Sequence, residues 1–231
     1  MGNGEIVVTG ASGALGSGVV RALAASGRRV IAVERDAARA QQAFAGVANC
    51  RVVGFDVSST EAWQSALGDS EIAGAVLVAG AWKGGSRFFE AGSDAIWSTL
   101  MSANLETARV ALQALLPRMV LAKAGSIVAI GSRSGPRPWE GAKAAAYAAS
   151  KAAVIALVQA CAAEVLLDGV RINAILPSTI DTPANRAAMP KHDPSQWVSV
   201  ESLAGVIAFL LSDAARDISG AAIPVFGRDG V

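Results

Sequence analysis

The segment EIVVTGASGALGSGVVRALAA, from Glu5 to Ala25, joins a β-branched apolar run to an alanine-rich helical stretch through a glycine-rich turn. Glycine lacks a Cβ, so it permits a tight turn and a close approach of the backbone to a phosphate. The helix that follows offers free N–H groups and the positive end of its dipole. We therefore expect a nucleotide pyrophosphate to bind at this turn, which contains Gly10, Ser12, Gly13, Ala14, Leu15 and Gly16.

Short apolar runs alternate with helical stretches along the rest of the chain. The runs are apolar on consecutive positions, as in strands buried on both faces of a parallel sheet. This rhythm predicts an α/β fold, a doubly wound Rossmann-like sheet of about seven parallel strands with helices on both faces. We expect a single domain over residues 1–231, in which 1–130 mainly bind coenzyme and 131–231 complete the catalytic and substrate-binding part. The expected strands are Ile6–Val8, Val30–Val33, Arg51–Phe55, Ala75–Ala79, Ser126–Ile130, Val170–Leu176 and Ala222–Phe226, and the long helices are Leu15–Ala25, Trp97–Met119 and Ala144–Leu167.

Composition excludes several classes of partner. The 231 residues are 52% hydrophobic with a formal net charge of +1, so no electrostatic case exists for nucleic acid or an anionic membrane. Charges, Gly or Pro interrupt the apolar stretches before the roughly 20 residues that span a bilayer. The N-terminal sequence lacks the features of a signal peptide, so we expect a cytoplasmic location. Cys50 and Cys161 have no metal-ligand spacing and are predicted to be free thiols, and no metal is expected.

The end of the second expected strand bears on the choice of coenzyme. Glu34 follows Gly16 by eighteen residues, where a carboxylate accepts hydrogen bonds from an adenosine ribose and repels a 2′-phosphate. Its neighbour Arg35 could instead pair with that phosphate or stack on adenine. We therefore expect NAD or NADP, with NAD weakly preferred. Asp56 and Val57 follow the third strand, where Asp56 either receives the adenine amino group or caps the next helix.

The stretch YAASK places Tyr147 and Lys151 four residues apart in a predicted helix, on one face. A phenol is a poor acid–base group at neutral pH. We expect the nearby ammonium to stabilise the phenolate and to lower the pKa of Tyr147 towards the working range. Lys151 is also expected to bond the nicotinamide ribose. Tyr147 is the only tyrosine in the chain, which favours a catalytic role over a chance pairing.

Together these motifs make the chain similar, over nearly its whole length, to the short-chain dehydrogenase/reductase family. The resemblance implies that Ser132 orients the substrate oxygen, that Tyr147 is the general acid/base, that Lys151 tunes it, and that Asn104 links Lys151 to solvent through a water. Ser134 is a minor alternative to Ser132. The resemblance further implies that the loop Pro177–Thr182 holds the nicotinamide carboxamide, with Ile180 giving backbone contacts and Thr182 its hydroxyl. Further coenzyme contacts are expected at Ala79 and Gly80.

The chain also departs from the family's usual pattern. It has TGxxGxxG in place of TGxxxGxG and LVAGAW (Leu77–Trp82) in place of NNAG. The stretch VAGAWKGG resembles dihydropteridine reductase, in which a tryptophan at the position of Trp82 lines the pterin site. A quinonoid dihydropteridine reductase that uses NADH is thus an alternative to a general carbonyl/alcohol oxidoreductase. A non-catalytic NAD(P)-sensing regulatory protein, or an epimerase or dehydratase that retains its coenzyme, are alternatives of another class.

Several further residues invite weaker predictions. Trp82, and less so Trp139 and Trp197, are candidates to line the pocket of a small carbonyl or alcohol substrate. His192 is expected to be a solvated loop residue, in a stretch from Pro183 to Trp197 that could form a lid. The helix segment Ala152–Leu167 is apolar almost all round, which predicts a homodimer or homotetramer.

Overall fold

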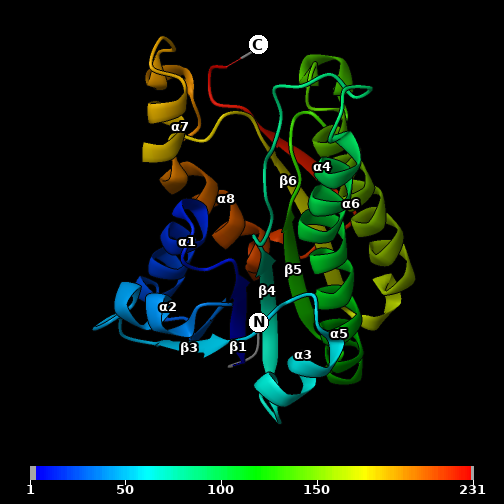
Figure 1. Ribbon diagram of the computed structural model, residues 1–231. Helices are drawn as coiled ribbons and strands as arrows, with labels where there is room; N and C mark the ends of the chain where they lie inside the picture. The colour runs from blue at the N-terminus through cyan, green and yellow to red at the C-terminus, as the bar shows by residue number, and fades with distance from the viewer. Residues whose placement is uncertain (1–3, 230–231) are drawn as a thin grey trace.

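The computed structural model describes residues 4–229, and its strands form a single seven-stranded sheet (Figure 1). Every pairing is parallel, and the strand order is β3-β2-β1-β4-β5-β6-β7. The predicted doubly wound sheet of seven strands is confirmed. The strands are β1 (Glu5–Thr9), β2 (Val30–Glu34), β3 (Cys50–Gly54), β4 (Ile72–Leu77), β5 (Gly125–Ile130), β6 (Val170–Pro177) and β7 (Ala222–Val225).

Helices cover both faces of the sheet. Figure 1 shows α1, α2 and α8 on one side and α3, α5 and α6 on the other. The helices are α1 (Ala14–Ala25), α2 (Ala37–Ala43), α3 (Thr60–Leu67), α4 (Ser93–Leu100), α5 (Thr107–Ala122), α6 (Ala145–Glu164), α7 (Pro183–Ala188) and α8 (Val200–Leu211). Short 3₁₀ turns are η2 (Pro138–Gly141), η3 (Leu166–Asp168), η4 (Pro194–Gln196) and η5 (Asp213–Ala215).

The two faces explain why the strand sequences are apolar without alternation. Neighbouring residues of one strand point to opposite sides, so Val7 packs with α5 and α6 while Ile6 and Val8 pack with α1 and α8. In β4, Ala75 likewise packs on the face covered by α5 and α6, and Val76 packs on the face covered by α1 and α8. Both halves of the core therefore draw on every central strand.

The strand order reverses around β1, which pairs with β2 on one side and with β4 on the other. The connections that leave β1 and β4 consequently turn to opposite faces. This reversal opens a crevice at the carboxyl ends of the strands, where ligands of open α/β sheets bind. The glycine-rich turn of Gly10–Gly16 lies at this edge, directly after β1.

The long helix expected over Trp97–Met119 is not uniform. A π-helical segment, η1 (Met101–Glu106), joins α4 to α5, so the helical path runs from Ser93 to Ala122 with wide turns in its middle. The helix propensities of these six residues do not predict the change from α-helix to π-helix, because all six are compatible with an α-helix. Asn104 lies inside η1 and is buried.

Helix α6 has the length and apolarity of a membrane span by composition alone. In the fold it packs against β6 and η1 and supplies part of the core, including Val154 and Val158. Its predicted range of Ala144–Leu167 is slightly too long, since the helix ends at Glu164 and a 3₁₀ turn follows. The apolar composition of α6 is therefore explained in part by burial against the sheet.

Candidate active site

A cleft of about 740 Å³ lies at the carboxyl ends of the strands, in the crevice described above. Its wall contains thirteen of the residues that the sequence predicts to bind coenzyme. They are Gly10, Ser12, Gly13, Ala14, Leu15, Gly16, Glu34, Arg35, Asp56, Val57, Ala79, Gly80 and Ile180. Residues from five separate connections, those after β1, β2, β3, β4 and β6, thus come together around one space.

The glycine-rich turn depends on close backbone packing. Gly10 has a φ of +61°, and an ideal Cβ placed on it falls 2.9 Å from Ala79 Cα. An ideal Cβ on Gly16 falls 2.2 Å from the carbonyl oxygen of Gly10, so no side chain fits there. Gly13 precedes α1 and provides no side-chain cap, and the first residues of the helix, Ala14, Leu15 and Gly16, line the cleft. This arrangement suits the anionic bridge of a dinucleotide.

Glu34 is held across this turn by three donors. The backbone N–H and the hydroxyl of Ser12 donate to Oε2 at 3.2 and 2.7 Å, and the N–H of Arg35 donates to Oε1 at 3.0 Å. The carboxylate therefore stands at the mouth of the turn with a fixed orientation. Arg35 and Arg39 line the same end of the cleft, so this end carries both signs of charge.

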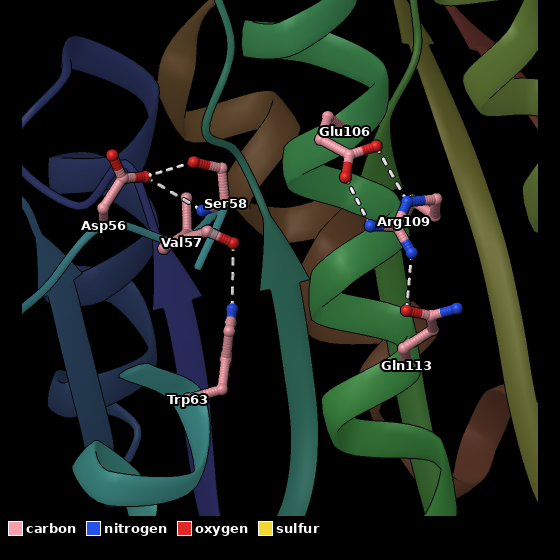
Figure 2. Close-up of polar contacts among 7 residues, drawn as sticks. All are labelled: Asp56, Val57, Ser58, Trp63, Glu106, Arg109 and Gln113. Carbon is pink, nitrogen blue, oxygen red and sulfur yellow. Dashed lines mark hydrogen bonds and ion pairs between the residues drawn. The ribbon is translucent and has the colours of Figure 1, made fainter. Parts of the chain in front are cut away.

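The connection after β3 is shaped by polar contacts (Figure 2). The N–H and hydroxyl of Ser58 donate to Asp56 Oδ1 at 2.9 and 2.7 Å, and these bonds hold the pKa of Asp56 below its usual value. Trp63 Nε1 donates to the carbonyl of Val57 at 2.9 Å. The alternative that Asp56 caps the next helix is wrong, because Ser59 caps α3. Asp56 stays on the cleft wall with its second oxygen available.

Lys151 lies directly behind the cleft wall. Its side chain is buried, and Nζ donates to the carbonyl of Ile130 at 2.8 Å. An ideal Cβ on Gly80 would fall 3.5 Å from the same Nζ, and both Ile130 and Gly80 line the cleft. Burial lowers the pKa of Lys151 from 10.5 to about 8. The expected approach of Lys151 to Tyr147 is also present, with Nζ 6.0 Å from the centroid of the phenol ring.

The direction predicted for the pKa of Tyr147 is wrong for the free protein. Burial of the phenol raises this pKa, and hydrogen bonding with Ser132 opposes the increase only in part. Lys151 Nζ donates to the carbonyl of Ile130, and its presence near the phenol does not outweigh the desolvation of Tyr147. The phenol is therefore held in its protonated form, ready to donate a proton.

Asn104 joins η1 to the cleft wall. Its Oδ1 accepts from the N–H of Ala81 at 2.8 Å, and its Nδ2 donates to the carbonyl of Ala81 at 3.0 Å and to Ser150 Oγ at 2.9 Å. An ideal Cβ on Gly80 would fall 2.6 Å from Oδ1. Asn104 and Lys151 thus flank the same glycine, but the side-chain amide of Asn104 is occupied by Ala81 and Ser150.

The loop after β6 contributes to the opposite wall. Ile180 lines the cleft and forms a parallel bridge with Val198, while its carbonyl accepts from Asn185 Nδ2 at 2.8 Å. Thr182 Oγ1 accepts from the N–H of Asn185 at 3.1 Å and thereby caps α7. Pro177, Thr182, Tyr147 and Lys151 are not part of the cleft wall itself, although the sequence predicts coenzyme contacts for them.

The tryptophans separate into two groups. Trp82 and Trp139 are 68% and 74% exposed on the loops after β4 and β5, so their rings are free to meet a ligand. Trp197 is buried and belongs to the packing of the fold. His192 is exposed, as predicted, and Cys50 and Cys161 are free thiols. Among residues 4–229 no group of three or more His, Cys, Asp or Glu side chains is arranged to hold a metal.

Sequence reasoning missed a further part of the cleft wall. Thr99, Ser102 and Ala103 line it from the end of α4 and the start of η1, and Arg39 lines it from α2. The first three lie five, two and one positions before Asn104, which are not the i,i+3 or i,i+4 spacings of one helix face. Arg39 lies in α2, whereas Arg35 precedes that helix. No spacing rule in the sequence therefore indicates these residues, and only the placement of the helices in the fold identifies them.

The chain belongs to the short chain dehydrogenase family, whose model matches residues 5–193. It is 33% identical to galactitol 2-dehydrogenase (L-tagatose-forming) of Cereibacter sphaeroides, across 95% of this chain and 92% of the relative. It is 31% identical to the 3-oxoacyl-acyl-carrier-protein reductase MabA of Mycobacterium tuberculosis, across 98% and 93%.

Solved structures agree with this assignment. An oxidoreductase of the short chain dehydrogenase/reductase family from Burkholderia thailandensis superposes with a TM-score of 0.89 at 30% identity, covering 98% of this chain and 92% of that one. An NAD⁺-bound xylitol dehydrogenase superposes with a TM-score of 0.87 at 25% identity, covering 97% and 98%.

The protein is therefore an oxidoreductase that transfers a hydride between a nicotinamide coenzyme and a small alcohol or carbonyl compound. The cleft fits such a coenzyme, since it combines uncapped N–H groups at α1, a carboxylate at Glu34 and a backbone packed too closely for side chains at Gly10 and Gly16. The pterin reductase, the non-catalytic sensor and the epimerase alternatives are not favoured.

Proposed function

We propose that Tyr147 is the general acid/base of this enzyme, that Ser132 orients the reacting oxygen, and that Lys151 and Asn104 support them. The observation that carries this proposal is the position of the Tyr147 phenol, whose pKa the nearby Ser132 side chain lowers against the effect of burial, beside the buried ammonium of Lys151. Ser132 is almost fully buried, and its Oγ also accepts from the N–H of Ser134 at 3.2 Å. The pair can hold one oxygen atom between two hydroxyl groups.

In the reductive direction the protonated phenol of Tyr147 gives its proton to the carbonyl oxygen, and Ser132 donates a hydrogen bond to the same oxygen as negative charge develops on it. The coenzyme, when bound, supplies the hydride to the carbonyl carbon. The phenolate that remains is stabilised by the ammonium of Lys151 until solvent restores the proton. Oxidation of the alcohol uses the same groups in reverse, with Tyr147 as the base.

NAD is the proposed coenzyme. Glu34 is oriented by Ser12 and Arg35, and a fixed carboxylate there accepts hydrogen bonds from ribose hydroxyls and repels a 2′-phosphate. Arg35 and Arg39 reduce the preference for NAD over NADP, because either guanidinium can pair with the 2′-phosphate of NADP. The expected preference is thus for NAD with residual activity towards NADP.

A polyol and its ketose are the proposed substrate pair. The similarity to a galactitol dehydrogenase supports a polyhydroxylated substrate. The exposed rings of Trp82 and Trp139 support it further, since flat aromatic faces pack against the C–H surface of a sugar chain. We also propose that the protein forms a homodimer or homotetramer through the apolar helix α6, which light scattering of the purified protein would test.

Reduction of NAD⁺ with galactitol or xylitol, and oxidation of NADH with the matching ketoses and a 3-oxoacyl thioester, test the proposed chemistry. Tyr147→Phe should reduce turnover by about 10²- to 10⁴-fold with coenzyme affinity nearly unchanged. Ser132→Ala and Ser134→Ala form a matched pair, of which only the first should lose activity. Turnover that survives in Tyr147→Phe would overturn the assignment, and activity with the thioester alone would replace the polyol by an acyl substrate.

A further inference from the structure

A fully buried serine stands directly before Lys151. Ser150 Oγ donates to the carbonyl of Tyr147 at 2.8 Å and receives a hydrogen bond from Asn104 Nδ2 at 2.9 Å. A hydroxyl has one hydrogen, so Ser150 is the donor towards Tyr147 and the acceptor towards Asn104. The side chain therefore connects the π-helical segment η1 to the first turns of α6.

The choice of residue at this position is unusual for its surroundings. Ser150 is the only serine in α6 and has Ala148, Ala149, Ala152 and Ala153 nearby. Alanine is the better helix former, and a serine that bonds to the carbonyl three residues earlier slightly weakens the helix. The hydroxyl thus serves a contact outside α6, and that contact is Asn104.

Ser150 completes the hydrogen bonding of the Asn104 amide. The two other bonds of this amide go to the N–H and the carbonyl of Ala81, so all its polar atoms are paired in a buried place. Ser150 Oγ, as an acceptor, fixes which end of the amide is the nitrogen. Ala81 follows Gly80, which lines the coenzyme cleft beside Lys151. A continuous series of bonds therefore runs from the cleft wall to Tyr147.

We propose that Ser150 is a positioning residue, which sets the placement of Tyr147 and Lys151 relative to the cleft wall at Gly80 by holding the Asn104 amide. The inference rests on the proposed roles of Tyr147 and Lys151. Ser150 touches neither of the two reacting partners and acts through Asn104 and the Tyr147 backbone. Loss of the hydroxyl leaves a buried N–H of Asn104 without an acceptor, and the amide must turn or move to find one.

A double-mutant cycle tests this role. Ser150→Ala should lower kcat by about 10- to 100-fold, because a displacement near 1 Å at a catalytic group costs on that order. If Ser150 acts through Asn104, the double variant Asn104→Ala/Ser150→Ala should be no slower than Asn104→Ala alone. If the decrease in kcat of the double variant equals the product of the two single decreases, the two residues act independently and the inference is overturned. A Ser150→Ala enzyme with kcat within twofold of wild type would overturn it as well.

Two further variants separate positioning from packing. Ser150→Cys keeps the shape of the side chain but bonds weakly, so it should resemble Ser150→Ala in kcat, and a fully active cysteine variant would overturn the inference. Ser126→Ala is the matched control, since Ser126 is equally buried and its hydroxyl donates to the carbonyl of Leu210 at 3.0 Å, away from the site. It should lower thermal stability without a change in kcat.

The dependence of kcat on pH supplies a readout that packing alone does not move. Burial lowers the pKa of Lys151 to about 8, so kcat should be measured as a function of pH on both sides of this value. The pH dependence of kcat should shift in Ser150→Ala and stay unchanged in Ser126→Ala. Should Ser150→Ala fail to fold, Ser150→Cys carries the same comparison. Loss of turnover in Tyr147→Phe with a normal Ser150→Ala enzyme overturns this inference alone. Retained turnover in Tyr147→Phe overturns the proposed function together with the inference.

Discussion

The connections after β1, β2 and β3 differ in construction from those after β4 and β5. The first set forms its part of the cleft from glycines without room for a side chain, such as Gly10 and Gly16, and from the short contact between Ser12 and Glu34. The second set consists of longer loops with the exposed rings of Trp82, Phe89 and Trp139.

The difference follows from what each part must recognise. The nicotinamide coenzymes share one pyrophosphate bridge and the same two riboses, and a close-packed backbone that binds these groups has little freedom for change. A substrate rim on long loops tolerates replacement of its side chains, because few of them support the core. We therefore propose that the first part of the cleft specifies the class of enzyme and that the second determines its individual substrate.

Lys151 lies behind the cleft wall, where its Nζ donates to the carbonyl of Ile130, and its replacement should have the largest effect. Lys151→Met should reduce turnover by about 10²- to 10⁴-fold, since the phenolate of Tyr147 loses its cation. The measurement is kcat for the proposed polyol substrate at a saturating concentration of the proposed coenzyme, NAD⁺. A fully active Lys151→Met variant would show that turnover does not depend on the ammonium of Lys151, and it would contradict the prediction.

The same variant has a predicted effect on stability. Burial lowers the pKa of Lys151 from 10.5 to about 8, so between these values the unfolded chain binds a proton that the folded chain does not. The free energy of unfolding of the wild type should rise with pH across this window, by up to about 3 kcal/mol, and the methionine variant should lack the rise. Urea denaturation at pH values on both sides of the window checks this, and parallel curves would contradict it.

Replacement of Glu34 should change the choice of coenzyme without changing the chemistry. Glu34→Gln removes the charge but keeps the shape that Ser12 holds, and the ratio of kcat/KM for NADPH to that for NADH should rise by about 10- to 100-fold. Asp36→Asn is the matched control, because Asp36 accepts from the N–H of Arg39 and caps α2 outside the cleft wall. An unchanged ratio in Glu34→Gln would shift the discrimination to Arg35 and Arg39.

The smallest effect is expected at the substrate rim. Arg133 follows Ser132 and connects its loop to the segment after β7, with Nε 3.0 Å from Glu140 Oε2 and Nη1 2.6 Å from the carbonyl of Asp229. Arg133→Met should raise KM for the substrate several-fold, with KM for the coenzyme unchanged, because only the loop after β5 loosens. Arg216→Met, at an exposed arginine beside Asp217, is the control. Equal changes in KM for the substrate and in KM for the coenzyme would contradict the separation of the cleft into a coenzyme part and a substrate part.

Thirteen of the residues selected from the sequence line one cleft, for a physical reason. Its determinants are local, since Gly10, Gly13 and Gly16 act within one turn and Glu34 ends the next strand. Tyr147 and Lys151 are also local, four residues apart on one helix.

The parts that the sequence did not predict depend on contacts between distant segments. The bond from Asn104 to Ser150 spans 46 positions, and η1 is visible only once α4 and α5 are placed. The pKa of Tyr147 was predicted in the wrong direction because burial is a property of the whole fold. The substrate remains a proposal for the same reason, as the rim is formed by loops whose packing no short motif encodes.

The π-helical segment η1 fixes the number of residues that the chain needs between α4 and α5. A stretch of wide turns accommodates a surplus residue within an otherwise regular helix. Deletion of any one residue in 101–106 would allow ordinary helical pairing to resume, and it would turn everything on one side of the cut by about 100° relative to the other. Asn104 and the residues of α5 that fill the core could not then both keep their directions. Shortened versions of this enzyme should therefore tolerate loss of residues in the outer part of the loop after β4, at 85–91, but not here.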